Sequence, residues 1–287
     1  MALSNRGRLG TLRVFGPDSD GIIAACSNLM GNYGCNIVKS ETWSDKKENM
    51  FFQRLAFTYD EPDKVACQQD LTEICKDFNL ENRLNWRGRK QKVGIMVSKY
   101  DHCLWELLLR HSAHELPEMD IELVISNHPE LKSVAETFQV PYHCIPITHE
   151  TKAEQEAKQL ELLKNVDIVV LARYMQVLSG DFLSHFPEKI INIHHSFLPA
   201  FMGGRPYHAA HARGVKLVGA TAHYTTEDLD EGPIISQDVI SVTHRDEVKD
   251  MMRKGRILER NVLFKALEAH LDDRVIVHKN RCIVFED

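Results

Sequence analysis

The densest group of polar side chains in the sequence follows an apolar run and reads Asn192-Ile193-His194-His195-Ser196. In an extended segment alternate residues share a face, so Asn192 and His194 are expected to point the same way. An amide donor beside an imidazole suits stabilisation of an oxyanion that develops on an acyl carbon. Taken alone, a polar strand end that caps its own turn is the more common explanation of such a pattern.

A second polar group is the acidic turn from Glu227 to Glu231, between two apolar stretches. A carboxylate at the end of a strand could orient a water molecule or pair with a histidine. A solvated turn is the simpler interpretation of these residues by themselves. Their spacing does not match that of a calcium-binding loop.

The histidines raise a third possibility, which is a metal site. His194 and His195 could be joined by His208 and His211, which are spaced one helical turn apart. Neither a cysteine pair nor a His-Glu-x-x-His pattern supports such a site. We therefore expect no metal.

Length and composition limit the classes of protein to which this chain can belong. A chain of 287 residues predicts two domains, and a formal net charge of −6 argues against a general nucleic-acid binder. The chain has no apolar run of about 18 residues and its start lacks an apolar signal core, so neither membrane nor export is expected. Seven cysteines without metal or redox spacing predict reduced thiols, and together these features predict a cytoplasmic protein.

The first 86 residues predict a small α/β domain. Its apolar patterns give the order strand, helix, strand, strand, helix, strand, which is typical of a ferredoxin-like βαββαβ sheet with both helices on one face. Asp18, Ser19 and Asp20 could cap the first helix, and Pro62 opens the second. The basic run from Arg87 to Lys92 is then interpreted as a solvated linker.

The remaining residues, 93–287, predict a larger α/β domain. Near-continuous apolar strands at Val93–Val97, Ile121–Ser126 and Asp167–Leu171 are separated by helical stretches, which indicates a Rossmann-like, mostly parallel sheet covered on both faces. Farther on, Lys216–Tyr224 and Pro233–Val242 predict two strands without an intervening helix. Open α/β sheets bind ligands beyond the carboxyl ends of their strands, which directs attention to the segments after Leu171, Ile191 and Tyr224.

Three stretches of this second region resemble the formyltransferase-fold enzymes that handle 10-formyltetrahydrofolate. They are NIHHSFLPAF, GGRPYHAAHARG and GATAHYTTEDLDEGPIISQ. Within that fold, the doubled histidine at His195 and the stretch from Leu171 to Ser179 resemble the formyltetrahydrofolate deformylases. The segment from Pro17 to Ile23 is similar to the first strand-to-helix turn of an ACT domain, a ferredoxin-like regulatory module. The resemblance therefore divides the chain into an ACT-like domain (1–86), a linker (87–92) and a formyltransferase-fold catalytic domain (93–287).

The resemblance implies hydrolysis of 10-formyltetrahydrofolate to tetrahydrofolate and formate, which supplies formate for purine biosynthesis. Asn192 and His194 would donate hydrogen bonds to the developing oxyanion, and Asp230 would position and deprotonate the attacking water. Neither a metal nor a cofactor besides the folate substrate is implied. Substrate contacts are expected in an apolar slot after the Leu171 strand and beside the catalytic strand, from Leu171, Arg173, Tyr174, Met175, Val177, His195 and Ser196.

Two alternatives remain to be distinguished. Glycinamide ribonucleotide formyltransferase holds phosphate in a Gly-Ser-Asn-like loop, whereas the equivalent segment here, Ser98–Cys103, lacks glycine and suits a close backbone wrap poorly. That transferase also usually has proline where His195 stands. A non-catalytic folate or amino-acid sensor is a second alternative, and the intact Asn-His-Asp set argues against it. The ACT resemblance further suggests an amino-acid effector and a homo-oligomer.

Overall fold

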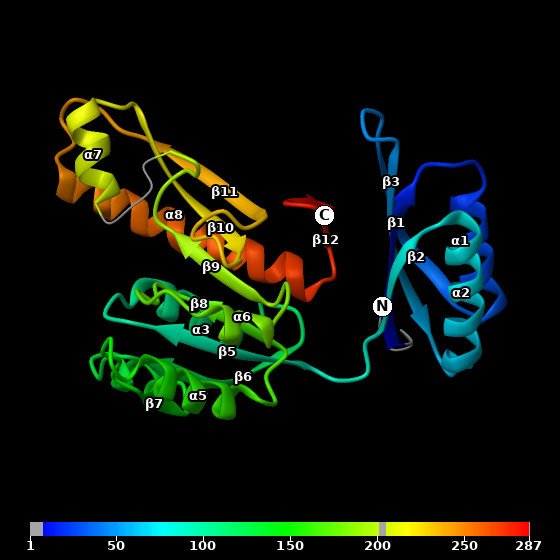
Figure 1. Ribbon diagram of the computed structural model, residues 1–287, viewed down its shortest axis with the longest axis horizontal. Coiled ribbons are helices and arrows are strands. Elements are labelled where there is room, and N and C mark those ends of the chain that lie inside the picture. Colours follow the sequence, from blue (N-terminus) through cyan, green and yellow to red (C-terminus); the bar gives the residue numbers. More distant parts are fainter. Residues whose placement is uncertain (1–7, 201–204, 287) are drawn as a thin grey trace, which may run out of the picture. The chain divides into compact units, whose positions relative to one another are not determined.

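The computed structural model describes residues 8–200 and 205–286, which fall into two compact units (Figure 1). The first unit holds the described residues up to Arg89 together with those from Ile283 onward, and the second is Lys90–Cys282. The last residues, which the sequence placed in the catalytic domain, therefore group with the first unit, where Lys39 Nζ donates to the carbonyl of Glu286 at 3.1 Å. Within the described ranges, none of the helices has the length and apolar character needed to cross a membrane.

The first unit has the predicted ferredoxin-like arrangement. Its elements are β1 (Arg8–Pro17), α1 (Ile22–Asn32), β2 (Asn36–Asp45), β3 (Met50–Tyr59), α2 (Lys64–Phe78) and β4 (Glu81–Trp86). The sheet has the order β2-β3-β1-β4, and its neighbouring strands are antiparallel. A single buried cluster joins Met30 of α1 and Leu71 of α2 to Leu12 and Leu55 of the sheet, so both helices pack on the same face.

The start of α1 differs from the expectation. Its N-cap is Gly21, in a left-handed conformation with φ 97°, and none of the described side chains caps it, so the capping assigned to Asp18, Ser19 and Asp20 is wrong. Glycine adopts this conformation without a steric penalty, and the turn therefore needs no side-chain cap. In α2 the side chain of Asp63, directly after Pro62, does cap the helix by accepting from the Ala66 amide.

The second unit is built on a seven-stranded sheet. Its elements are β5 (Gln91–Val97), α3 (His102–Ser112), β6 (Met119–Ser126), α4 (Lys132–Thr137), β7 (Tyr142–Cys144), α5 (Lys152–Leu163), β8 (Ile168–Leu171), α6 (Gly180–Ser184), β9 (Ile190–His194), α7 (Pro206–Arg213), β10 (Leu217–Tyr224), β11 (Ile234–Ser241), α8 (Val248–Leu271) and the short strand β12 (Val275–His278). The boundary between the units falls within the last strand, β13 (Arg281–Val284). Because β5 begins at Gln91, the last two residues of the predicted linker are strand.

The sheet order β11-β10-β9-β8-β5-β6-β7 places β8 and β9 next to each other in its middle. The strands from β9 to β7 are parallel, as predicted, and β10 and β11 continue the sheet as an antiparallel pair. All four residues of β8 are buried, as expected for a central parallel strand. The helices α5 and α6 contribute Leu163 and Phe182 to the core on one face. The 24-residue helix α8, orange in Figure 1, runs along β9, β10 and β11.

Candidate active site

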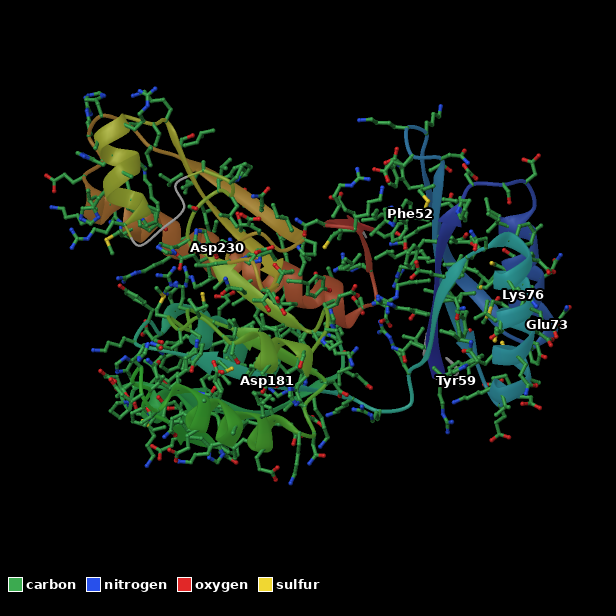
Figure 2. The ribbon with its side chains drawn as sticks, in the orientation of Figure 1. Phe52, Tyr59, Glu73, Lys76, Asp181 and Asp230 are labelled. Carbon is green, nitrogen blue, oxygen red and sulfur yellow. The ribbon has the colours of Figure 1, made fainter. Side chains whose placement is uncertain are left out.

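Two of the predicted catalytic residues lie on β9. Asn192 and His194 alternate along this strand and emerge beside the turn that follows β10. The turn carries Asp230 back over the strand pair (Figure 2), and its carboxylate lies 3.1 Å from His194 Nδ1. The structure therefore brings Asn192, His194 and Asp230 together in one place.

Asp230 has the environment of an ionised base. Its side chain is 13% exposed and the His194 side chain is 7% exposed. Burial by itself raises the pKa of the Asp230 carboxyl, but the hydrogen bond from His194 and the charge of the His194 ring outweigh it, so that its pKa lies below the usual value. The lowered pKa keeps the carboxyl ionised at neutral pH, so that its oxygens are free to accept a hydrogen bond from water.

His223, on β10, is a member of this site to which the sequence analysis assigned no role. Its Nδ1 lies 2.9 Å from the carbonyl of Tyr224, so Nδ1 carries the proton and Nε2 accepts from the Asn192 amide at 3.2 Å. Burial lowers the pKa of His223, in agreement with a neutral ring. The sequence signal was present, because a histidine interrupts the apolar run of the strand that pairs with the Asn192 strand.

The turn that carries Asp230 is held in a defined shape. Asp230 has a left-handed backbone with φ 59°. A Cβ atom at Gly232 would lie 1.8 Å from the carbonyl oxygen of Tyr224, so only glycine permits this approach. The side chain of Asn280 donates to the carbonyl of Glu231 at 2.8 Å, which fixes the turn from outside.

His195 and Ser196 follow the catalytic strand. The ring of His195 lies 5.1 Å from that of His194 and 6.1 Å from that of Tyr207, measured between centroids. Burial, helped by the charge of Arg173, lowers the pKa of His195 to about 4, so its imidazole is neutral at physiological pH. Ser196 is buried and its hydroxyl donates to the carbonyl of Ala200 at 2.8 Å, which uses that hydrogen within the turn.

The predicted folate segment after β8 divides into buried and exposed residues. Leu171 and Tyr174 are buried, and Tyr174 Oη accepts from Gln159 at 3.0 Å. Met175 and Val177 are 51% and 56% exposed, so their side chains offer apolar surface to a ligand.

One backbone donor of this segment is already engaged. The amide of Met175 donates to Ser98 Oγ at 2.9 Å, and Ser98 in turn donates to Asn127 at 2.6 Å. Recognition of a pterin edge by backbone groups of residues 173–177 would therefore have to use groups other than the Met175 amide.

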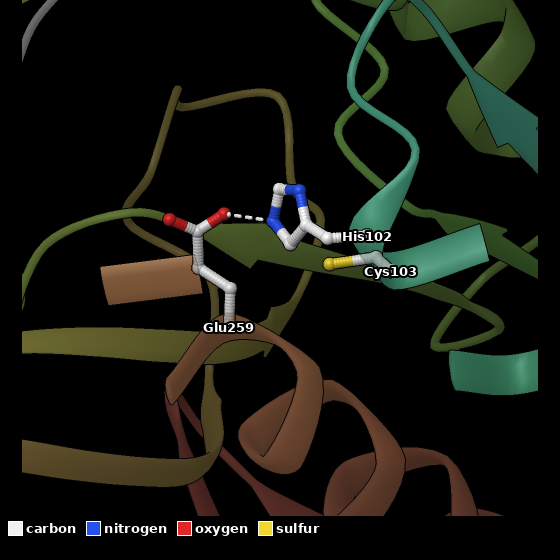
Figure 3. Close-up of side chains that lie close together, drawn as sticks. All are labelled: His102, Cys103 and Glu259. Carbon is white, nitrogen blue, oxygen red and sulfur yellow. Dashed lines mark hydrogen bonds and ion pairs between the residues drawn. The ribbon is translucent and has the colours of Figure 1, made fainter. Parts of the chain in front are cut away.

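Arg173 points into the protein, toward a second cluster of charged side chains. Its Nε lies 3.5 Å from Glu259 Oε2, and their side chains are 7% and 3% exposed. His102 Nε2 contacts the same carboxylate at 2.7 Å, with Cys103 alongside (Figure 3). Across the described ranges, His102, Cys103 and Glu259 form the one group of three such residues with metal-like spacing.

The chemistry of this cluster fits an ion pair better than a metal centre. The guanidinium of Arg173 already neutralises the Glu259 carboxylate. Burial raises the pKa of the Cys103 thiol well above its ordinary value, whereas a metal ligand would be the thiolate. The other histidines considered as ligands are dispersed, since His208 and His211 are exposed on α7 and His194 pairs with Asp230.

An apolar cavity of about 370 Å³ has His195 and Ser196 in its wall. Phe197, Tyr207, Leu217 and Val218 are among its lining residues, and none of them comes from the segment after β8. The cavity is therefore distinct from the apolar slot that the sequence predicted after Leu171. Phe201, Gly203 and Gly204, which belong to the motifs quoted above, lie outside the described residues.

Comparison with known proteins agrees with this geometry. Residues 91–267 match the family model described as formyl transferase. A formyltetrahydrofolate deformylase of Synechocystis sp. is 45% identical over 282 residues, which cover 96% of this chain and 98% of the relative. One from Bacillus subtilis is 45% identical over 281 residues, covering 96% and 93%. The chain belongs to the formyltetrahydrofolate deformylase family.

Solved structures separate this family from its transferase relatives. The crystal structure of a formyltetrahydrofolate deformylase from Pseudomonas syringae pv. tomato has a TM-score of 0.94 at 41% identity, covering 99% of this chain and 96% of that one. Glycinamide ribonucleotide transformylase 1 from Symbiobacterium toebii has a TM-score of 0.66 at 29% identity, covering 71% of this chain and 98% of that one. Deformylase family members therefore share both units, whereas the transferase matches over a smaller part of the chain.

Proposed function

We propose that this protein hydrolyses 10-formyltetrahydrofolate to tetrahydrofolate and formate. The observation that carries the proposal is the state of His194. Its Nδ1 pairs with Asp230, and its Nε2 is buried without a hydrogen-bond partner among the residues that the structure describes. A buried polar atom without a partner is costly unless a ligand supplies one, and the formyl oxygen of the substrate is a suitable acceptor.

The three residues divide the reaction between them. Asp230 accepts a proton from water as the water oxygen bonds to the formyl carbon, and the π electrons of the carbonyl move to its oxygen. Asn192 Nδ2 and His194 Nε2 donate hydrogen bonds to that oxygen. When the tetrahedral intermediate collapses, the bond between carbon and N10 breaks, N10 takes the proton from Asp230, and formic acid leaves, which gives up its remaining acidic proton to solvent and becomes formate. These residues supply the base and the donors, so the proposed reaction calls for neither a metal nor a cofactor.

The exposed side chains of Met175 and Val177 support a folate site beside this trio. They lie on the segment after β8, at the carboxyl end of a parallel strand where ligands of such sheets bind. Leu171, Arg173 and Tyr174 are buried, so their side chains support the shape of the segment and do not offer surface to the ligand. The formate produced would supply purine biosynthesis, and the reaction would balance the pool of one-carbon folates.

The first unit is proposed to be a regulatory, ACT-like domain that binds a small amino acid and joins copies of the chain into a homo-oligomer in the cytoplasm. Its support is the ferredoxin-like strand order β2-β3-β1-β4 with both helices on one face. Neither nucleic acid nor membrane is expected as a partner.

Formate release from 10-formyltetrahydrofolate by the purified protein tests the proposal. A metal chelator in a parallel reaction tests the proposed absence of a metal requirement. Formate produced at an undiminished rate with the chelator supports the hydrolysis by Asp230. A protein that binds folate but releases no formate would be a folate sensor instead.

A further inference from the structure

Glu259 on α8 is a buried carboxylate to which the proposed hydrolysis assigns no part. It contacts three other segments of the second unit. Arg173 Nε, after β8, lies 3.5 Å from Oε2, and His102 Nε2, at the start of α3, lies 2.7 Å from the same oxygen (Figure 3). Tyr207 Oη, on α7, donates to Oε1 at 3.0 Å. One carboxylate thus ties α3, α7 and the segment after β8 to the long helix α8.

The cluster is charged throughout the physiological range. Burial opposes the ionisation of Glu259, but the hydrogen bond from His102 and the charge of Arg173 outweigh it and lower its pKa to about 2. A buried charge of this kind persists only when its partners compensate it, and removal of one partner leaves the other uncompensated. Arg173 and Glu259 therefore depend on each other.

Arg173 is also a special position in the main chain. Its φ is 67°, a left-handed value that residues other than glycine seldom adopt and that costs free energy. The Arg173 side chain makes two contacts. Its guanidinium lies 5.0 Å from the centre of the Tyr100 ring, and its Nε pairs with Glu259. Two residues later, the Met175 amide is fixed on Ser98 Oγ.

We propose that Glu259 is a positioning residue for folate binding, because its ion pair with Arg173 holds the main chain of residues 173–177 in the shape that receives the pterin ring. This inference rests on the proposed function, which assigns the folate to that segment. Glu259 does not touch the reacting atoms in this account. It acts on the binding of the substrate more than on the chemical step.

The first test is Glu259→Gln. The amide keeps the shape of the side chain but removes the charge that compensates Arg173. We expect the KM for 10-formyltetrahydrofolate and the Kd for tetrahydrofolate to rise roughly tenfold or more, because a small displacement of a positioning group is costly. The kcat is expected to stay within about threefold of wild type, since Asn192, His194 and Asp230 are untouched.

A double-mutant cycle separates positioning from general stability. In Arg173→Gly the glycine accepts the left-handed backbone without strain but lacks the ion pair, so the same rise in KM and Kd is expected. If Glu259 acts through Arg173, Glu259→Gln in the Arg173→Gly background should add less than about twofold, whereas independent effects would multiply. Because the double variant carries neither buried charge, its KM and Kd can still be measured if Glu259→Gln alone is insoluble.

The control is Val262→Ala, at a fully buried residue one turn farther along α8. It should lower the melting temperature while leaving KM and Kd within about twofold of wild type. A soluble Glu259→Gln or Arg173→Gly protein with wild-type KM and Kd would overturn the positioning role, and so would multiplicative effects in the cycle. Absence of formate release in the wild type would instead overturn the proposed function, and the Kd measurements would still report on Glu259.

Discussion

The ring of His223 lies 3.2 Å from the side-chain nitrogen of Asn192 and 2.9 Å, through its other nitrogen, from the carbonyl oxygen of Tyr224. The carbonyl determines which ring nitrogen is protonated, and the other nitrogen then determines which end of the Asn192 amide faces it. One N–H of the amide is used in this contact, and the second is left for the substrate. His223 thereby orients one of the two oxyanion donors.

Replacing His223 with leucine should reduce kcat about tenfold to a hundredfold, because the Asn192 amide loses the acceptor that orients it. His223→Gln is the matched control, since its side-chain oxygen can accept from the amide and should recover part of the rate. Steady-state formate release measures both variants. Equal rates for leucine and wild type would exclude this role of His223.

Asp230→Asn should abolish most turnover while leaving folate binding largely intact. The change is near-isosteric and removes the base but not the pocket, and loss of a positioned general base typically costs about 10² to 10⁴ in rate. Formate release gives the rate, and equilibrium binding of tetrahydrofolate gives the affinity. Turnover within about twofold of wild type would remove Asp230 from the mechanism.

The stability of the protein should fall as the pH is lowered from about 6.5 to about 4, in part because of His195. The folded state holds this imidazole neutral, with its pKa lowered from 6.5 to about 4, whereas the unfolded chain binds the proton near the ordinary value. The unfolded state therefore takes up more protons within this window and is favoured as the pH falls. We expect His195 to account for about 2 kcal/mol of the loss.

Urea unfolding at several pH values, with wild type and His195→Gln side by side, measures this contribution. The glutamine variant has no group that titrates at this position, so its free energy of unfolding should change less between pH 6.5 and pH 4. Parallel curves for the two proteins would show that His195 is not held neutral in the folded state.

Glycinamide ribonucleotide should neither accept the formyl group nor compete with folate. The resemblance implies that the segment Ser98–Cys103 is the equivalent of the loop that holds phosphate in the transferase. Here His102 turns inward onto Glu259, and Tyr100 is 37% exposed with the Arg173 guanidinium over its ring. A reaction with the amine in excess decides the matter, by measuring formate and formylated ribonucleotide together. Formylated ribonucleotide as the main product would make the protein a transferase. If formate is the only product, Tyr100→Gly and His102→Gly then test which side chain excludes the amine.

A fragment that begins at Lys90 should fold and bind folate, because the seven-stranded sheet and its helices lie within Lys90–Cys282. Any response to an amino-acid effector should disappear with the first unit. Folate binding and amino-acid response, measured on the fragment and the full chain, provide the test. A soluble fragment that still responds would remove the regulatory role from the first unit.

The periodicity of apolar residues was sufficient to predict both sheets, since each long strand and helix carries its own pattern. β7, α6 and α7 were missed because they are too short to show a period. The cap of α1 was assigned incorrectly because a left-handed glycine can replace a side-chain cap, and sequence alone does not show which of the two the turn uses.

Only part of the candidate site could be predicted from the sequence. The spacing of Asn192 and His194 placed them on one face, and the resemblance added Asp230. His223 is visible in the sequence as a histidine that interrupts an apolar strand, but its partners, like those of Glu259, could not be assigned from spacing. Their contacts depend on antiparallel strand register and on the rotation of α8. Whether a charged residue in the middle of an amphipathic helix is buried depends on the elements that pack against the helix, and the order of residues along the chain does not show this.

The close approach of Gly232 to the Tyr224 carbonyl also limits how this enzyme can diversify. A side chain at residue 232 would meet the carbonyl at 1.8 Å, so the hairpin that bears Asp230 closes at a fixed size. Insertions there would change the reach of the carboxylate toward His194. Leu229, by contrast, is 64% exposed on the same hairpin. Homologous chains are therefore free to vary the outer surface of this hairpin. Its length, in contrast, sets the distance between the Asp230 carboxylate and the formyl carbon of the substrate.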